Sequence, residues 1–246
     1  MEWPATAHCA PLVQDEVRVW LADLGNGADC VEHLTQVLSE DERERATRFH
    51  FRHAAIRWAM RRVVLRSILG RYLCVEPRAG RFQSGPREKP EVAMLEEEHI
   101  QFNASHSDGF GLYAVARIRR VGVDIERMRP LPDFEAIARR MFSPDEQRVL
   151  GALPRAERPA AFFDGWTRKE AYIKAIGEGL AYPLERFSVS LSPHAPAKLE
   201  DVRDDPAEVE RWSLAALAAA FGYAAALAIE GPLPRLLCAR WQERAC

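Results

Sequence analysis

Cysteine is scarce in this sequence and follows no recognisable spacing. The five cysteines form no CxxC pair, and they are Cys9, Cys30, Cys74, Cys238 and Cys246. An odd and unpatterned set argues against a disulfide framework and against a structural zinc site. The same usage favours a reducing compartment, so we expect a cytoplasmic protein.

Long uncharged segments are also missing. The longest one covers residues 212–229, is interrupted by Gly222 and is rich in alanine. It is short for a membrane span, which needs about 20 strongly apolar residues. The start of the chain, Met1-Glu2-Trp3-Pro4, lacks a basic region followed by an apolar run, so we expect no signal peptide. The sequence therefore predicts no membrane partner.

An excess of charge of one sign is absent, because the formal net charge is −2 over 246 residues. With 48% hydrophobic and 28% charged residues, the composition is that of a soluble globular protein of one large or two small domains. A chain of this charge is not built as a whole to bind a polyanion, so we expect no nucleic acid partner. The exception is local, since nine arginines fall between residues 43 and 71.

The most informative stretch that is present covers residues 166–180. It predicts a helix that ends at Gly177. Glu170 lies within an apolar stripe of this helix, where an unpaired carboxylate is costly. Its partner is either Lys174, one helical turn further along, or a metal ion.

A second pair of acids lies on a predicted strand over residues 121–126. Because strand side chains alternate, Asp124 and Glu126 project from the same face, about 6–7 Å apart along the strand. Two like charges at this separation favour a divalent cation, and hard oxygen ligands suit magnesium or manganese. A solvated strand edge is the structural alternative.

The arginine-rich segment begins with a capping box, in which Ser39 is the N-cap and Glu42 the third helical residue. Arg57 lies about 120° from Arg45 on an unbroken helix. Either the helix breaks near Phe51, or Arg57 serves another surface. The structural interpretation is a solvated face, whereas the functional one is a surface for a phosphate-bearing ligand.

A polar segment over residues 102–109 predicts a turn that precedes a strand over residues 112–116. In it, His106 lies between Ser105 and Ser107, and these side chains offer donors and acceptors that can hold a phosphate. Hydroxyl hydrogen bonds within a turn are the structural alternative.

The remaining pattern predicts a mixture of helices and strands. A short amphipathic helix is expected over residues 134–141, followed by a capping box that gives Glu146 a structural role. Residues 187–191 alternate as in a strand. Residues 212–229 have the propensity of a helix, although Gly222 would also allow a hairpin.

Taken together, these pieces resemble the surfactin-type 4′-phosphopantetheinyl transferase family. The strongest part is the run Trp-x-x-Lys-Glu-Ala-x-x-Lys-Ala-x-Gly-x-Gly-Leu over residues 166–180. The order and spacing of the pieces make the resemblance specific, and they span most of residues 39–190. Besides that run, they are Lys89-Pro90, Phe102-Asn103-Ala104-Ser105-His106-Ser107, Gly122-Val123-Asp124-Ile125-Glu126, and Phe142-Ser143 with Glu146.

The resemblance implies an α+β fold of two similar halves related by a pseudo-twofold axis. We place the halves at residues 1–120 and 121–246, with the ligands at their junction. By similarity, Gly222 to Ile229 forms a strand of the second half, and we follow the family here rather than the helix propensity. A fold built from two internal halves has no need of a second copy, so we expect a monomer.

The resemblance also implies a reaction. The phosphopantetheine arm of coenzyme A moves to a serine of an acyl or peptidyl carrier protein, and adenosine 3′,5′-bisphosphate leaves. One Mg²⁺, or Mn²⁺, is held by Asp124, Glu126 and Glu170. Glu170 is also the candidate base for the carrier serine.

Contacts to coenzyme A follow from the same resemblance. Lys174 neutralises charge on the phosphates, while His106 and Ser105 donate hydrogen bonds to them. The adenosine end is held by the basic set Arg45, Arg57 and Lys89. The sequence departs from the family at Glu88, which replaces a glycine, and at Glu42, which replaces a basic nucleotide contact.

For the carrier protein, we expect steering by Arg139 and Arg140 and an apolar contact from Met141 and Phe142. Two other functions compete with this interpretation. A metal-dependent phosphohydrolase would use the same three carboxylates on a nucleotide-like substrate, without a protein acceptor. A nucleic-acid-binding protein would use the arginine-rich helix, and the net charge disfavours it.

Overall fold

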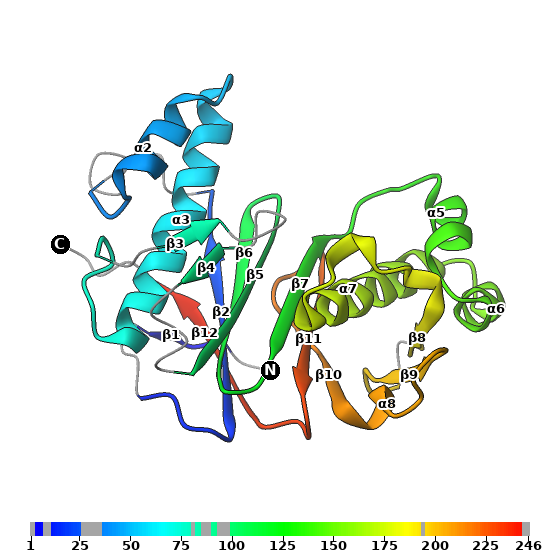
Figure 1. The fold of residues 1–246 in the computed structure, drawn as a ribbon. Helices are drawn as coiled ribbons and strands as arrows, with labels where there is room; N and C mark the ends of the chain where they lie inside the picture. Colours follow the sequence, from blue (N-terminus) through cyan, green and yellow to red (C-terminus); the bar gives the residue numbers. More distant parts are fainter. Residues whose placement is uncertain are drawn as a thin grey trace.

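The predicted α+β class is confirmed by a computed structural model, in which two sheets lie at the centre and helices cover the outside (Figure 1). Among the helices of the described residues, none is long and apolar enough to cross a membrane. The structure describes residues 3–6, 11–25, 36–79, 82–84, 90–92, 99–192 and 195–242.

The first half is a sheet with a long helix, α3, on one face. The strand order is β1-β12-β2-β6-β5, and β12 (Arg235–Trp241) reaches it from the end of the chain. A separate pair is formed by β3 (Phe82–Ser84) and β4 (Pro90–Val92). The other elements are β1 (Ala5–Thr6), β2 (Glu16–Asp23), α2 (Glu40–Thr47), α3 (Arg52–Leu73), β5 (Ile100–Ser107) and β6 (Phe110–Arg117).

The second half is a three-stranded sheet, ordered β10-β11-β7, that packs on helix α7. A small pair, β8 with β9, lies beside it. The elements are β7 (Val121–Arg127), α5 (Phe134–Met141), α6 (Pro144–Ala152), α7 (Arg158–Ile176), η3 (Gly179–Ala181), η4 (Leu184–Arg186), β8 (Phe187–Val189), β9 (Leu199–Val202), α8 (Glu208–Arg211), β10 (Trp212–Ala216) and β11 (Tyr223–Glu230).

The two halves repeat one topology. In each half, a strand is followed by a long helix and then by two more strands. The last of these strands always lies in the middle, so β6 separates β2 from β5, and β11 separates β7 from β10. All four pairings are antiparallel. This repeat agrees with two similar halves, while the boundary at residue 120, between β6 and β7, stays a prediction.

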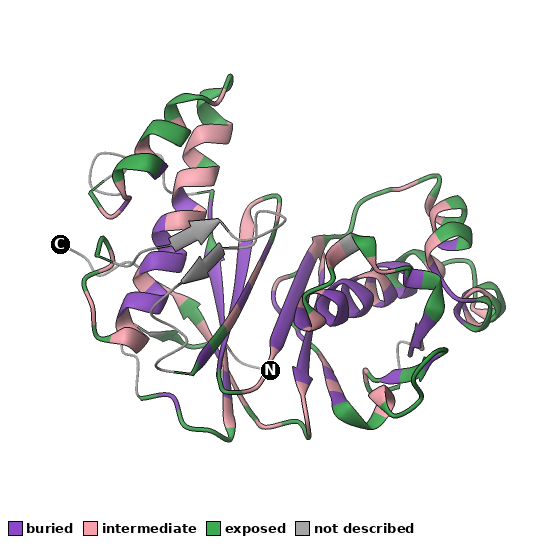
Figure 2. Cartoon of the chain, in the orientation of Figure 1, coloured by how far each residue is buried: buried purple, intermediate pink, exposed green. Residues whose placement is uncertain are grey.

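The central strands β2, β6, β7 and β11 are buried on both faces, as their purple colour in Figure 2 shows. On β2, Val17 and Val19 pack toward the other sheet, and Trp20 packs toward α3. On β7, Val123 and Ile125 belong to the same intersheet core. The molecule is therefore layered as helix, sheet, sheet and helix, and anything polar between the sheets needs a partner.

The polar turn predicted over residues 102–109 is wrong in its extent. Strand β5 continues through Ser107, and the turn consists of Asp108 and Gly109 alone. The physical reason is that Asn103, Ser105 and Ser107 alternate along the strand and find their hydrogen bonds on β7.

The arginine-rich segment forms two helices, so of the two alternatives the structure has the helix break near Phe51. Phe51 is the N-cap of α3. Glu42 accepts a hydrogen bond from the backbone N–H of Ser39 at 3.2 Å, as the capping box predicts. Its buried carboxylate also pairs with Arg62 and Arg66, each at 2.5 Å. Glu42 therefore fastens α2 to α3.

Residues 212–229 form strands β10 and β11, so the family-based expectation is confirmed and the helix propensity is overridden. On β11, Ala224, Ala226 and Ala228 face the core around α7, while Leu227 and Ile229 face the other sheet. The alternation of small and large side chains suits a strand buried on both faces. Helix propensity is a weak prior that such packing overrides.

Strand β7 and helix α7 approach so closely that one position has no room for a side chain. A Cβ atom at Gly122 would lie 2.1 Å from the carbonyl oxygen of Ala171 and 2.5 Å from the backbone nitrogen of Ala175. The lack of a side chain at Gly122 thus sets the distance between β7 and α7, which carry Asp124 and Glu170.

We expect Gly122→Ala to lower the free energy of unfolding by about 2 kcal/mol or more, because backbone atoms cannot yield as a flexible side chain does. Urea denaturation measures the change. Gly151→Ala in α6 is the matched control, since its Cβ would meet nothing within 4 Å. It should be neutral or stabilise by up to about 1 kcal/mol. Equal stabilities of the two variants would contradict the close contact.

Candidate active site

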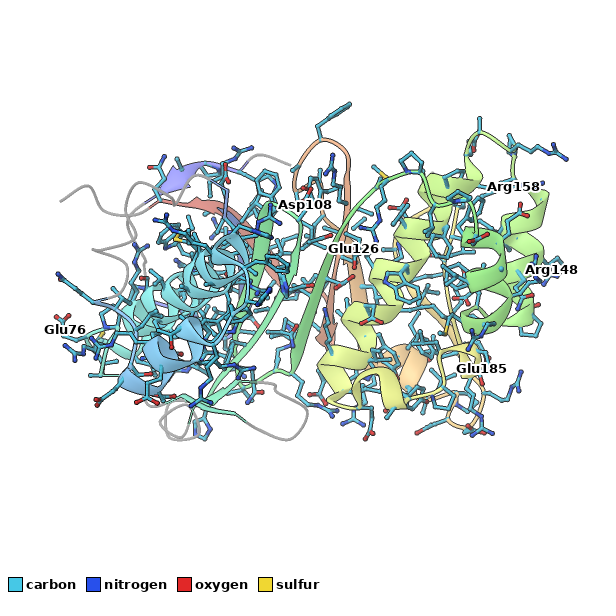
Figure 3. The ribbon with its side chains drawn as sticks, turned by 90° about the horizontal axis from the view of Figure 1, so that it is seen from above. Glu76, Asp108, Glu126, Arg148, Arg158 and Glu185 are labelled. Atoms are coloured by element: carbon cyan, nitrogen blue, oxygen red, sulfur yellow. The ribbon has the colours of Figure 1, made fainter. Side chains whose placement is uncertain are left out.

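The two halves meet where β5 lies beside β7, and side chains join these strands. Glu126 lies at this junction, close to Asp108 (Figure 3). Three polar residues at alternate positions of β5 form hydrogen bonds with three residues of β7. The bonds are Val123 N to Asn103 Oδ1 at 3.1 Å, Ser105 Oγ to Asp124 Oδ1 at 2.7 Å, and Ser107 Oγ to Glu126 Oε2 at 2.7 Å.

Asp124 is buried at the centre of this junction. Its Oδ1 atom accepts hydrogen bonds from Ser105 Oγ and, at 2.6 Å, from Lys174 Nζ. Its Oδ2 atom is buried and has no hydrogen-bond partner among the described residues. One side of the carboxylate is therefore held, and the other is available to a ligand.

Glu170 comes to the same place from α7, as its position in the apolar stripe predicts. The side chain is buried, and its Oε1 atom has no hydrogen-bond partner in the described part of the chain. Burial raises the pKa of Glu170 to about 7, and the charge of Asp124 acts in the same direction, while Lys174 opposes both. The two carboxylates therefore lie close enough to repel each other.

Glu126 completes the acidic set from the half-buried end of β7. Burial is the largest cause of its raised pKa, and the Asp124 carboxylate contributes to the same rise. Burial also raises the pKa of Asp124, against the attraction of Lys174. Negative charge thus accumulates at the junction, which is typical of sites that bind cations or perform chemistry.

The donor set fits a hard divalent cation. Two buried carboxylate oxygens, Asp124 Oδ2 and Glu170 Oε1, lack partners among the described residues, and oxygen ligands suit magnesium. In the same part of the chain, no group of three or more His, Cys, Asp or Glu side chains is arranged so that it could hold a metal ion. Lys174 instead provides the positive charge, through its bond to Asp124.

His106 points to the opposite side of β5 from its two serine neighbours. Its Nε2 atom contacts Nη1 of Arg61 on α3, so the ring nitrogen accepts and the ring proton lies on Nδ1. Desolvation, together with the charges of Arg61 and Lys174, lowers the pKa of His106 to about 4. The imidazole is therefore neutral at physiological pH, with Nδ1–H as a donor.

Ser105 and Lys174 lie together, as expected of two phosphate contacts, at 3.0 Å from each other. The Ser105 hydroxyl proton, however, is directed to Asp124. Ser105 thus orients the carboxylate, and the half-buried amine of Lys174 also donates to Asp124 Oδ1.

Two of the three residues expected at the adenosine end of coenzyme A are described by the structure, and their surroundings differ. Arg57 lies near the junction and pairs with Asp108 at 3.6 Å. Arg45 lies over the ring of Trp58, at 5.6 Å from its centroid. Lys89 lies outside the described residues, as does Glu88.

For one of the residues expected to contact the carrier protein, the prediction from the sequence is wrong. Phe142 is fully buried and stacks on Phe162, with ring centroids 5.4 Å apart, so its predicted role as a surface contact is wrong. Its apolar character serves the core around α7. Met141 is half-buried, and Arg139 and Arg140 are exposed.

Sequence reasoning missed Arg61. It follows Arg57 by four residues on α3, so both lie on one side of the helix. Continuing the arginine stripe from Arg57, once the helix break at Phe51 is accepted, would have found it.

Because its folded pKa is depressed, the ring of His106 should stay neutral down to about pH 5, and it should contribute stability above pH 6.5 that is lost as the pH falls toward 4. Arg61→Gln removes one neighbouring cation and should raise the midpoint. Ring ¹H–¹⁵N NMR signals against pH give both values. A midpoint near 6.5 in the unmodified chain would contradict the contact.

Two family models match this chain. Residues 120–228 match the family model of the 4′-phosphopantetheinyl transferase superfamily, and residues 28–117 match that of the 4′-phosphopantetheinyl transferase N-terminal region. The solved structure of a holo-(acyl-carrier-protein) synthase from Bacillus anthracis, in complex with CoA (3′,5′-ADP), is 21% identical. It has a TM-score of 0.36 and coverage of 46% of this chain and 96% of that one.

Two relatives are similar over most of the chain. The 4′-phosphopantetheinyl transferase HetI of Nostoc sp. is 40% identical over 221 residues, which are 89% of this chain and 90% of HetI. The 4′-phosphopantetheinyl transferase psf-1 of Bacillus pumilus is 34% identical over 77% of this chain and 79% of its own length. With the repeated fold and the acidic junction, these similarities show that the chain belongs to the 4′-phosphopantetheinyl transferase family.

Proposed function

We propose that this chain transfers the 4′-phosphopantetheine arm of coenzyme A to a serine of an apo acyl or peptidyl carrier protein, releasing adenosine 3′,5′-bisphosphate. The observation that carries the proposal is a pair of buried carboxylate oxygens, on Asp124 and Glu170 beside Lys174, that have no hydrogen-bond partner within the described ranges. The relatives described above are transferases by name, and no observation favours the phosphohydrolase alternative.

Asp124, Glu126 and Glu170 are the residues that would hold a divalent cation, Mg²⁺ or Mn²⁺. When bound, the ion supplies charge neutralisation and Lewis acidity to the pyrophosphate of coenzyme A. The hydroxyls of Ser105 and Ser107 keep Asp124 and Glu126 turned toward the junction.

Lys174 provides positive charge at the place where charge moves during the reaction. Phosphoryl transfer depends mainly on positioning and on neutralising the phosphate oxygens. The amine is held at 2.6 Å from Asp124 Oδ1 and at 3.0 Å from Ser105 Oγ, so its position is fixed before a substrate arrives. A preorganised charge of this kind needs no rearrangement at the moment of reaction.

Glu170 is the base in this proposal. In the structure, burial is the largest cause that raises its pKa to about 7. A carboxylate at the reacting centre can accept a proton from the attacking hydroxyl. The carrier serine would lose its proton to Glu170 as its oxygen attacks the β-phosphorus. The carrier protein would approach over the second half, where exposed Arg139 and Arg140 can steer an acidic surface. We also propose that the protein is a monomer and that it acts in the cytoplasm.

The transfer is tested by the intact mass of an apo carrier protein after incubation with this chain, coenzyme A and Mg²⁺. We expect a gain of one phosphopantetheine, which Glu170→Gln should slow by at least about 100-fold because the base is lost. Glu185→Gln is the matched control, since this exposed glutamate lies far from the junction (Figure 3). An unchanged carrier mass with several unrelated carriers would refute the proposal.

Metal binding is tested without turnover. We expect Mn²⁺ to bind the chain, as followed by the loss of the free-ion signal in electron paramagnetic resonance. Asp124→Asn should weaken binding at least about tenfold, because a ligand charge and the unpartnered Oδ2 are both changed. The exposed pair of Asp145 with Arg148 offers the control, Asp145→Asn. Equal affinities of the two variants would contradict the assignment.

A further inference from the structure

The turn between β10 and β11 carries an aromatic side chain that takes no part in the core. Phe221 is 105% exposed, which is more than any other large apolar side chain in the part of the chain that the structure describes. Other residues of the same turn are buried, because Leu217 and Ala219 belong to the core between the two sheets. The base of the turn is therefore anchored, while the phenyl ring of Phe221 lies in solvent.

Two hydrogen bonds from distant parts of the chain fix the conformation of this turn. Trp3 Nε1 donates to the carbonyl oxygen of Ala218 at 2.6 Å. The backbone N–H of Met128, directly after β7, donates to the carbonyl oxygen of Gly222 at 2.8 Å. A side chain on a fixed backbone loses less conformational entropy when it binds, so Phe221 is preorganised for a contact.

The turn lies beside the candidate active site. In the pairing of β11 with β7, Ala224 is opposite Glu126. Phe221 precedes Ala224 by three residues, which is at most about 10 Å along an extended chain. Figure 3 shows the turn next to the labelled Asp108 and Glu126. A protein partner whose reacting serine enters the junction would therefore come within contact distance of the phenyl ring.

The surface next to Phe221 combines apolar and basic side chains. Met128 is also exposed, at 38%, and it lies between the exposed residues Arg127 and Arg129. Burial raises the pKa of Glu126, and the charge of Arg129 opposes that rise, so Arg129 acts on the same junction. An apolar centre with a basic border suits a partner that is apolar beside its reacting group and acidic around it.

We propose that Phe221, together with Met128, is the apolar anchor on which the acyl or peptidyl carrier protein docks. This rests on the proposed function, in which the carrier serine must reach Glu170, and it adds a docking element on the turn between β10 and β11. Aromatic side chains that become buried at the centre of an interface carry much of its binding energy. Loss of the ring should therefore weaken the interaction with the carrier and leave that with coenzyme A unchanged.

Initial rates of transfer at varied concentrations of an apo carrier protein, with coenzyme A saturating, test this docking. Phe221→Ser should raise KM for the carrier at least about tenfold, while kcat and KM for coenzyme A change less than about twofold. Phe221→Leu should recover part of the loss, because it restores apolar area. Leu233→Ser is the matched control, since Leu233 is an apolar residue, 49% exposed, beyond the other end of β11.

Three results would count against this docking element. Equal KM values for the carrier in the unmodified chain and in Phe221→Ser would overturn it, and so would equal effects of Phe221→Ser and Leu233→Ser. An unmodified chain that sediments as a dimer, with Phe221→Ser as a monomer, would assign the ring to a second copy instead. A chain that leaves every carrier unmodified would refute the proposed function itself.

Discussion

The junction depends on the buried carboxylate of Asp124 and its bond to Lys174. Removing an ionised carboxylate from water costs several kcal/mol, and the cost is offset only by good partners. Ser105 comes from the first half and Lys174 from α7 of the second, so satisfying Asp124 Oδ1 fixes three elements at once. The site is thus built from the contact that holds the two halves together.

Helix α7 carries two such ion pairs, and the difference between them separates structure from function. Lys169 is fully buried against Glu146, whose carboxylate also accepts from the backbone N–H groups of Ser143 and Val189. That carboxylate is saturated and joins α6, α7 and β8. Around Lys174, by contrast, Asp124 Oδ2 and one oxygen of Glu170 have no partner among the described residues. A buried polar atom left in this way calls for an explanation, and a bound ion is one that fits an acidic site.

The same distinction applies to the arginines of α3. Glu42 pairs with both Arg62 and Arg66, so these charges are neutralised within the fold. Arg61 has no such partner in the described residues and faces His106 instead. Charge that is neutralised within the fold stabilises the packing of α2 on α3, and charge that is left over defines the ligand side of the same helix.

The local sequence pattern gave the wrong secondary structure or burial at positions where contacts with distant parts of the chain determine the structure. The alanine-rich residues 212–229 have helix propensity, yet burial on both faces makes them strands. The polar residues 102–107 look like a turn, yet bonds to a neighbouring sheet keep them extended. Phe142, which follows a helix, looks like a surface contact in the sequence, yet it is buried in the core around α7. In each case the deciding partner is distant in sequence, so a local window cannot contain it.

The sequence by itself determined the family, the α+β class and the helix through residue 176, and it predicted which acids form the candidate site. These follow from order, spacing and periodicity, which are properties of the chain alone. Only the tertiary structure decided which oxygens of Asp124 and Glu170 are left without partners, that Ser105 serves Asp124, and that Arg61 faces His106. The reason is that hydrogen-bond satisfaction is a property of the assembled neighbourhood, and here each neighbourhood combines strands and helices far apart in the chain.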